Sequence, residues 1–147
     1  MKSIIVAFLF VSSVVFSQQN VNLKNGFIAN GYDVVEYFKN NAAKGNKKFQ
    51  TTVDGVKFKF SSVKNVEIFN SNPTKYTPQY GGYCAYAIGK TGEKVSINPK
   101  TFEIRDGKLY LFYNAWGTNT LELWNNESPK YLQKKADKNW KKLLKEK

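Results

Sequence analysis

The chain has 147 residues and a formal net charge of +12, and it contains one cysteine and no histidine. Without histidine, imidazole-based acid–base catalysis and Ser-His or Cys-His catalytic arrangements are excluded. The positive charge comes almost entirely from lysine, with Arg105 as the only arginine. Proteins usually recognise phosphates and bases through the forked guanidinium groups of arginine. Because the chain has one arginine, we expect no nucleic-acid partner.

The N-terminal segment over 1–17 predicts a signal peptide. Lys2 precedes an apolar run over 4–16, and small or polar residues follow it. This pattern is typical of secretion, and the run is shorter than the roughly 20 residues that span a bilayer. We therefore expect a periplasmic or secreted protein with a lead-in over 18–30 and a single domain over 31–147.

The mature chain begins with turn and cap signals. Asn30-Gly31 predicts a turn, and Asp33 is placed to cap a short helix over 34–38. Glu36, three residues after Asp33, completes the pattern of a capping box. A polar, lysine-bearing loop is expected over 40–48.

A hairpin and a helix follow this loop. Two β-prone runs over 49–53 and 56–60 flank Asp54-Gly55, a pair that favours a tight hairpin turn. Lysine alternates with apolar residues along the second run, so one face of the hairpin is expected to be buried. Ser61-Ser62 then offers an N-cap to a helix that Asn72-Pro73 ends.

Cys84 lies in the most informative segment of the chain, the run Tyr80-Gly81-Gly82-Tyr83-Cys84-Ala85-Tyr86-Ala87. The two glycines predict a close backbone approach followed by a short helix, whose N-terminus would stabilise a thiolate. A lone cysteine in an oxidising compartment is structural, reactive or intermolecular, and the sequence leaves these three interpretations open.

The last third of the chain predicts a second hairpin and two helices. A short strand is expected over 95–97, and Asp106-Gly107 joins two strands over 101–105 and 108–113. Apolar residues fall on both faces of the second of these strands, which predicts a central strand. A short helix is expected over 120–125.

A longer helix is predicted to begin at Ser128-Pro129, with serine as the cap and proline in the first turn. One side of this helix is apolar, and lysines crowd the rest. The apolar side holds Leu132, Ala136, Trp140, Leu143 and Leu144. Such a basic amphipathic helix fits docking on its own domain, or contact with an anionic membrane surface or an acidic protein. Together the elements predict an α+β fold, with a small antiparallel sheet from two hairpins and packed helices.

These motifs resemble the exported YHS domain-containing proteins of bacteria. The likeness rests on GYDVVEYF from Gly31, DGVKFKFSS from Asp54, PQYGGYCAYA from Pro78 and DGKLYLFYN from Asp106. The resemblance covers nearly the whole mature chain. It implies a YHS-like core of a hairpin followed by a helix, and a link to metal handling, copper in particular. It implies no defined reaction.

The chain departs from metal-binding YHS domains at the positions of their ligands. Those domains resemble Phe-Cys-Ser-x-x-Cys after the hairpin, whereas Ser61 and Asn65 stand at the two thiolate positions here. Cys84 is then the one soft donor of the mature chain, and copper or zinc prefers about two to four thiolate or imidazole ligands. A copper or zinc site at Cys84 therefore needs a second chain, and the sequence does not fix the oligomeric state.

Two functions fit these residues. The first is a binding module that holds a small ligand or a metal ion beside the Gly-Gly turn. Its expected ligand-binding residues are Asp33, Tyr37, Tyr80, Gly81, Gly82, Tyr83, Cys84 and Tyr86. The second is a thiol-based redox enzyme or sensor in which Cys84 cycles through sulfenic acid or a mixed disulfide. We favour the binding module, because one thiol without a resolving partner or a general base is poorly equipped for turnover.

Overall fold

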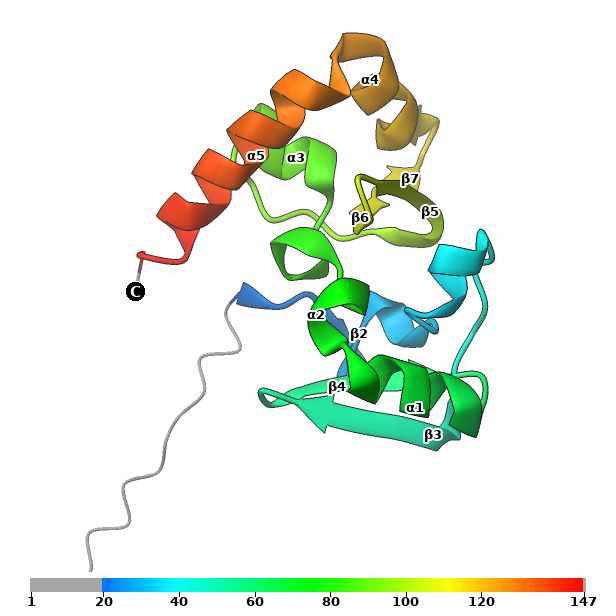
Figure 1. The fold of residues 1–147 in the computed structure, drawn as a ribbon. Coiled ribbons are helices and arrows are strands. Elements are labelled where there is room, and N and C mark those ends of the chain that lie inside the picture. The colour runs from blue at the N-terminus through cyan, green and yellow to red at the C-terminus, as the bar shows by residue number, and fades with distance from the viewer. Residues whose placement is uncertain (1–19, 147) are drawn as a thin grey trace, which may run out of the picture.

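The computed structural model describes residues 20–146 and shows an α+β fold (Figure 1). The predicted signal peptide over 1–17 lies outside the described residues. The helices are α1 (Val63–Ser71), α2 (Pro73–Tyr76), α3 (Ala85–Lys90), α4 (Thr120–Glu127) and α5 (Pro129–Leu143), with short 3-10 helices over Ala29–Gly31, Glu36–Lys39 and Gln79–Gly82. The strands are β1 (Leu23–Lys24), β2 (Phe27–Ile28), β3 (Asn46–Val53), β4 (Val56–Phe60), β5 (Asn98–Arg105), β6 (Lys108–Phe112), β7 (Asn114–Ala115) and β8 (Thr118–Asn119). The short strand predicted over 95–97 is wrong, because these residues have no regular structure.

The first sheet is mixed and has the strand order β1-β2-β4-β3. β3 and β4 form the predicted hairpin, in which Asp54 and Gly55 take φ values of 50° and 77° at the turn. β2 pairs with β4 in parallel, and the second hairpin, β5–β6, forms a sheet of its own. The prediction of one antiparallel sheet built from both hairpins is therefore wrong. The loop predicted over 40–48 is too long, since β3 already begins at Asn46 and accommodates a bulge before Gln50.

A single-turn 3-10 helix stands where a helix was predicted after Asp33. Its N-cap is Val35 and not the predicted Asp33, because the helix begins later than expected. Asp33 Oδ1 still accepts hydrogen bonds from the backbone N–H of Val35 at 2.9 Å and of Glu36 at 3.4 Å. The capping box is wrong, because the backbone N–H of Asp33 donates to the carbonyl oxygen of Ala43. The Glu36 carboxylate is therefore left to bind other donors.

Helix α1 packs on the β3–β4 hairpin. Ser62 caps its N-terminus as predicted, and Asn72 ends it and caps α2. The ring centroid of Phe69 lies 4.5 Å from that of Phe58 and 5.1 Å from that of Phe60, both on β4. The buried face of the hairpin and the apolar side of α1 thus form one core.

Strand β6 is buried on both faces although β5 is its only strand neighbour among the described residues. Leu109 and Leu111 belong to the core cluster that includes the β3–β4 hairpin. Tyr110 and Phe112 belong to a second cluster, shared with α3, α4 and α5. The predicted apolar contacts on both faces are confirmed, but the central position is wrong, because helices cover β6 where a further strand was expected.

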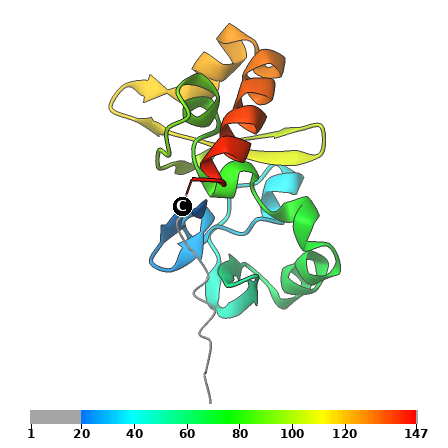
Figure 2. The ribbon, with the colours of Figure 1, turned by 90° about the vertical axis from the view of Figure 1, so that its left-hand side faces the viewer.

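Helices α3 and α5 pack against each other in the second cluster (Figures 1 and 2). Leu132 and Ala136 are buried at this contact, and Gly89 permits it, since a Cβ there would lie 2.8 Å from the carbonyl oxygen of Leu132. Pro129 is the first residue of α5 as predicted. Ser128 does not cap the helix, because its φ is 117° and its side chain makes no capping hydrogen bond. No helix in the described part of the chain is both long enough and apolar enough to cross a membrane.

Candidate ligand-binding cleft

The Gly-Gly turn is a left-handed stretch of backbone. Tyr80, Gly81 and Gly82 take φ values of 55°, 61° and 80°. The carbonyl oxygen of Gly81 accepts a hydrogen bond from the backbone N–H of Asn22 at 2.8 Å, and that of Gly82 accepts one from the Asn22 side chain at 3.0 Å. A Cβ at Gly81 would lie 2.0 Å from the carbonyl oxygen of Asn20, so only glycine fits this close approach.

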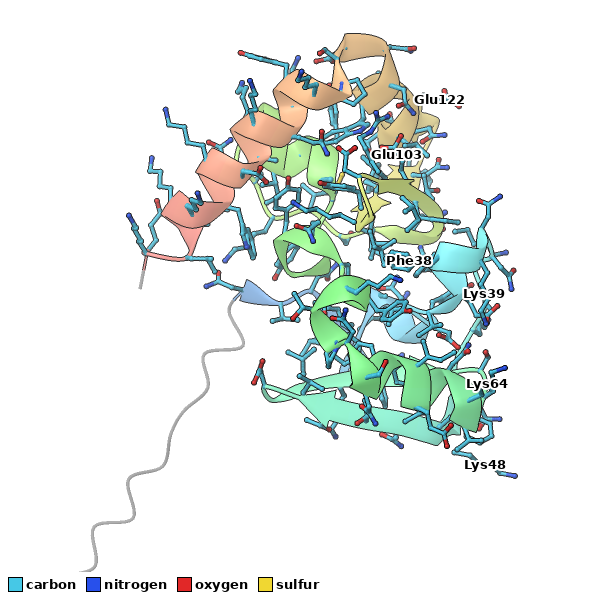
Figure 3. The ribbon with its side chains drawn as sticks, in the orientation of Figure 1. Phe38, Lys39, Lys48, Lys64, Glu103 and Glu122 are labelled. Atoms are coloured by element: carbon cyan, nitrogen blue, oxygen red, sulfur yellow. The ribbon has the colours of Figure 1, made fainter. Side chains whose placement is uncertain are left out.

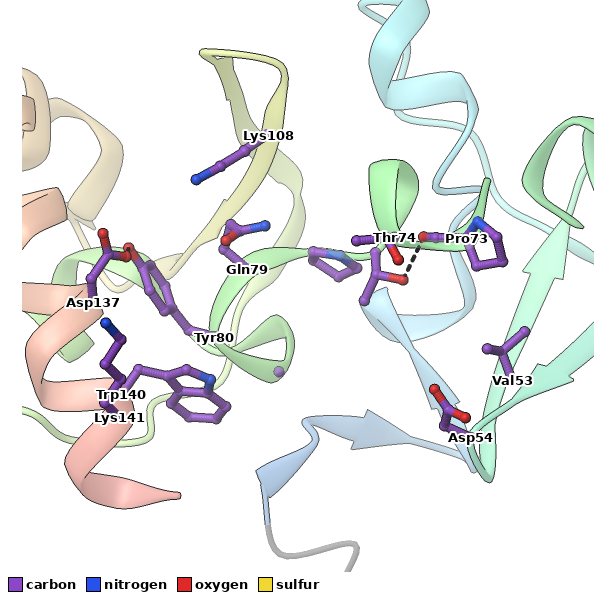
Figure 4. Close-up of a pocket in the computed structure, with 13 residues that line it drawn as sticks. Val53, Asp54, Pro73, Thr74, Gln79, Tyr80, Lys108, Asp137, Trp140 and Lys141 are labelled. Atoms are coloured by element: carbon purple, nitrogen blue, oxygen red, sulfur yellow. Dashed lines mark hydrogen bonds between the residues drawn. The ribbon is translucent and has the colours of Figure 1, made fainter. Parts of the chain in front are cut away.

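A cleft of about 520 Å³ lies beside this turn (Figure 4). One wall contains Tyr80 and the α5 residues Asp137, Trp140 and Lys141, as Figure 4 shows. The other wall is formed by α2 and the tip of the β3–β4 hairpin. Lys108, at the start of β6, also lines the cleft. The site is therefore assembled from four segments that are distant in sequence.

Polar and charged groups surround one indole ring in this cleft. Lys108 and Lys141 form no ion pair or hydrogen bond through their ammonium groups within the described residues. Trp140 is half-buried, and its ring centroid lies 6.3 Å from that of Tyr80. Gln79 contributes an amide. The carboxylates of Asp54 and Asp137 line the cleft as well. Such a lining is suited to a polar ligand that the two ammonium groups can bind, since drug-like apolar ligands require a mostly apolar pocket.

Tyr80 and Asp137 are joined by a hydrogen bond at the cleft, in which the Tyr80 hydroxyl donates to Asp137 Oδ1 at 2.9 Å. Burial raises the pKa of the Tyr80 phenol, and the Asp137 carboxylate raises it further. Tyr80 therefore stays a neutral donor at neutral pH and orients Asp137. This pair holds a carboxylate in place and provides no activated nucleophile.

Cys84 does not line the cleft, because it is a core residue at the start of α3. Its exposed fraction is 0%, and its Sγ lies 3.3 Å from Thr120 Oγ1. The Thr120 hydroxyl donates its single hydrogen to the carbonyl oxygen of Tyr113 at 2.7 Å, so the thiol is the donor to Thr120. This arrangement supports the structural interpretation of Cys84 and leaves no access for a reactant from solvent.

Asp33 belongs to a separate buried cluster. It is fully buried, and its Oδ2 accepts three hydrogen bonds of 2.7 Å, from the backbone N–H and hydroxyl of Ser61 and from Nδ2 of Asn65. Ser61 Oγ and Asn65 Nδ2 lie 3.3 Å apart. The carboxylate thus ties the 3-10 helix after Asp33 to the junction of β4 and α1.

Glu36 extends the Asp33 cluster to the surface. Its carboxylate accepts hydrogen bonds from Lys39 Nζ at 2.6 Å, Asn65 Nδ2 at 2.8 Å and Asn41 Nδ2 at 3.0 Å. The hydrogen bond from Lys39, followed by those from Asn41 and Asn65, lowers the pKa of Glu36 to about 2. Figure 3 shows Lys39 at the right-hand side of the view. Glu36 therefore remains charged in mildly acidic solution.

The other predicted site residues are used mainly for packing. The buried Tyr37 donates from its hydroxyl to the carbonyl oxygen of Pro99 at 2.6 Å, and Tyr86 donates to Glu127 at 2.6 Å. Of the predicted site residues, the structure brings Tyr80 and Gly81 to the cleft. The predicted site residues that do not line it are Asp33, Tyr37, Gly82, Tyr83, Cys84 and Tyr86.

Sequence reasoning missed Lys108, Asp137 and Lys141 as cleft residues. Lys108 directly follows a hairpin turn, and the other two lie on α5. No pattern in the sequence pairs these segments with the Gly-Gly turn. The one available signal was Trp140, an aromatic residue that the helix pattern assigns to packing.

The metal site that the YHS resemblance implies does not fit the residues present. Within residues 20–146, no group of three or more His, Cys, Asp or Glu side chains is placed to hold a metal ion. Cys84 is buried against Thr120, which also keeps its sulfur from a site shared between two chains. A soft metal would lack its thiolate or imidazole ligands here.

Comparison with known proteins adds no relative: no family model, no curated protein and no solved structure matches the chain.

Proposed function

We propose that the chain is an exported binding module with a YHS-like core, and that it holds a small, polar, negatively charged ligand beside the Gly-Gly turn. One observation carries this proposal: Lys108 and Lys141, without partners for their ammonium groups in the described structure, line the same cleft as the half-buried ring of Trp140. The ammonium groups attract an anion, and the indole ring offers a flat apolar surface for a sugar or another ring.

The YHS-like core of this proposal consists of the β3–β4 hairpin and α1. Its support lies at Ser61 and Asn65, the positions where metal-binding YHS domains carry thiolates. Both side chains bond Asp33, and their Oγ and Nδ2 atoms are 3.3 Å apart. Two side chains that bind one metal ion also lie close together. The short distance between Ser61 and Asn65 therefore favours an origin as a pair of metal ligands, which two hydrogen-bond donors have replaced.

The alternative functions have less support. A thiol-based redox enzyme or sensor needs a sulfur that a peroxide or disulfide can reach, and Cys84 is fully buried. Copper or zinc handling needs soft ligands that the described residues do not bring together. We therefore take a small anion, rather than a metal ion, as the ligand.

An NMR titration of the isotope-labelled mature chain tests this proposal. The probes are glucuronate and glucose, which share a sugar ring and differ in the carboxylate. We expect glucuronate to shift the backbone signals of Gly81 and Lys108 and the indole N–H signal of Trp140, and glucose to shift them less. If millimolar glucuronate shifts none of these signals, this ligand class is wrong.

A pair of double variants locates the binding site. Lys108→Ala with Lys141→Ala is expected to weaken glucuronate binding about tenfold or more, which corresponds to about 1.4 kcal/mol. The matched control, Lys47→Ala with Lys48→Ala, removes the same charge from β3 and should bind as the unaltered chain does. Equal weakening in both variants would refute the cleft as the site.

A further inference from the structure

Helix α5 presents its apolar side to the protein. Leu132 and Ala136 have exposed fractions of 2% and 0%, and both pack in the cluster shared with α3. Because this side is buried, α5 cannot insert it into a bilayer without breaking the contact with α3. Any partner of α5 must therefore meet the opposite side of the helix.

Five lysines form that opposite side, which we call the α5 lysine face. They are Lys134, Lys138, Lys141, Lys142 and Lys145. Four of them lie on α5, where 3.6 residues per turn and a rise of about 1.5 Å per residue place them within one arc over about 12 Å. Lys145 follows just after the end of the helix. All five are exposed, and none forms an ion pair in the part of the chain that the structure describes.

No lysine of the α5 lysine face forms an ion pair within the described residues, so only the nearby Asp137 carboxylate offsets part of their mutual repulsion. Like charges four residues apart destabilise a helix. Asp137, the one acidic residue among these lysines, accepts the hydrogen bond of Tyr80. The ion pairs of the described residues lie elsewhere: Lys39–Glu36, Lys90–Glu127 and Arg105–Glu103. The face is therefore complementary to negative charge on a partner.

We propose that the α5 lysine face docks the protein on an anionic membrane surface by electrostatic attraction and without insertion. Lysine carries a compact, strongly hydrated charge that suits a layer of mobile headgroups, whereas specific recognition of phosphate favours arginine. The only arginine, Arg105, pairs instead with Glu103 at 2.6 Å. Leu144, with an exposed fraction of 50% beside the face, adds an apolar contact at headgroup level.

The expected strength of membrane docking follows from the number of lysines on the α5 lysine face. Each lysine near an anionic surface raises the partition coefficient about fivefold, so the five together raise it on the order of a thousandfold. Because the Debye length falls from about 10 Å at 0.1 M salt to about 3 Å at 1 M, high salt should release the protein. Lys141 belongs both to the cleft and to this face, so docking is tested at Lys138 and Lys142, which do not line the cleft.

Vesicle co-sedimentation tests the proposal with the chain that lacks residues 1–17, because the apolar run would itself bind lipid. The vesicles contain phosphatidylcholine with or without phosphatidylglycerol. The test variant is Lys138→Glu with Lys142→Glu, and the matched control is Lys47→Glu with Lys48→Glu. Lys48 lies at the sheet end of the molecule, away from α5 (Figure 3). Circular dichroism and thermal melting confirm that each variant is folded.

We expect the unaltered chain to bind only the vesicles with phosphatidylglycerol. The α5 variant should lose about a hundredfold or more in partitioning, and the β3 control should stay within about fivefold of the unaltered chain. Glucuronate binding should persist in the α5 variant. The proposal is overturned by absent vesicle binding, by binding that high salt leaves intact, or by equal losses in the two variants. Absent vesicle binding would turn attention to an acidic protein as the partner of this face.

Discussion

Replacing Asp33 by asparagine exchanges one oxygen for an NH2 group in a buried site and tests whether the carboxylate is needed there. Asparagine has the same shape, but it presents an NH2 group where the native side chain presents a second oxygen. That NH2 group must face a donor in either orientation, because Oδ1 accepts from Val35 and Oδ2 accepts from Ser61 and Asn65. The variant therefore leaves buried hydrogen-bond donors without an acceptor in either orientation.

The smallest loss in the free energy of unfolding is expected for the orientation that breaks fewer hydrogen bonds. If the NH2 group takes the place of Oδ1, the bonds from Val35 at 2.9 Å and from Glu36 at 3.4 Å are lost, and a donor is left facing donors in a site without solvent. The three bonds to Oδ2 also lose the assistance of the negative charge. Loss of a buried partner and of charge assistance together costs about 3–5 kcal/mol. A domain of this size has about 5–15 kcal/mol of stability in total.

Urea denaturation at neutral pH measures this loss. The control is Asp106→Asn, which makes the same chemical change at an exposed hairpin turn and should alter the free energy of unfolding by at most about 0.5 kcal/mol. A double-mutant cycle with Ser61→Ala should show a coupling of about 1 kcal/mol or more, since the two residues share a bond. A loss below about 1 kcal/mol for Asp33→Asn, or strict additivity with Ser61→Ala, would refute the reasoning.

Three further predictions follow from single side chains. The pKa of Glu36 is lowered from 4.5 to about 2, so its stabilisation is complete above about pH 4.5 and is lost as the pH falls towards 2. This loss should be on the order of 1–2 kcal/mol because Lys39 is half-exposed, and Glu36→Gln should flatten that part of the pH–stability curve. Gly81→Ala should cost at least about 2 kcal/mol in urea denaturation, since the Cβ would meet the backbone at 2.0 Å. Gly107→Ala, at a similar φ but in open space, should cost only about 1 kcal/mol. The Cys84 thiol should react with Ellman's reagent in guanidinium chloride but not in the folded protein, and rapid labelling of the folded protein would restore the redox alternative.

The elements that the sequence predicts well are those fixed by local chemistry. The Asp-Gly pairs at Asp54 and Asp106 adopt the left-handed turn that tight hairpins require, so both hairpins are formed where predicted. Ser62 caps α1 with its own side chain, and Pro129 opens α5. In each case a few adjacent residues determine the backbone, and no distant contact is needed.

The elements that it does not predict depend on distant contacts. The parallel pairing of β2 with β4 joins segments about thirty residues apart, and no local pattern indicates it. The run over 95–97 is β-prone, but the backbone N–H of Cys84 bonds to the carbonyl oxygen of Val95 without extending into a ladder. The cleft illustrates the same limit, since Gly81 and Trp140 meet only after α5 has packed on α3.

The Asp33 cluster explains why the proposed YHS likeness does not bring a metal site with it. Under that likeness, Ser61 and Asn65 occupy thiolate positions, yet here both donate hydrogen bonds to a carboxylate without exposed surface. A thiolate at either position would be an acceptor, so its charge would repel the Asp33 carboxylate unless a metal ion compensated both. Serine and asparagine satisfy the carboxylate without an ion. Ligand recognition is then left to the open cleft, where Lys108 and Lys141 still lack partners among the described residues.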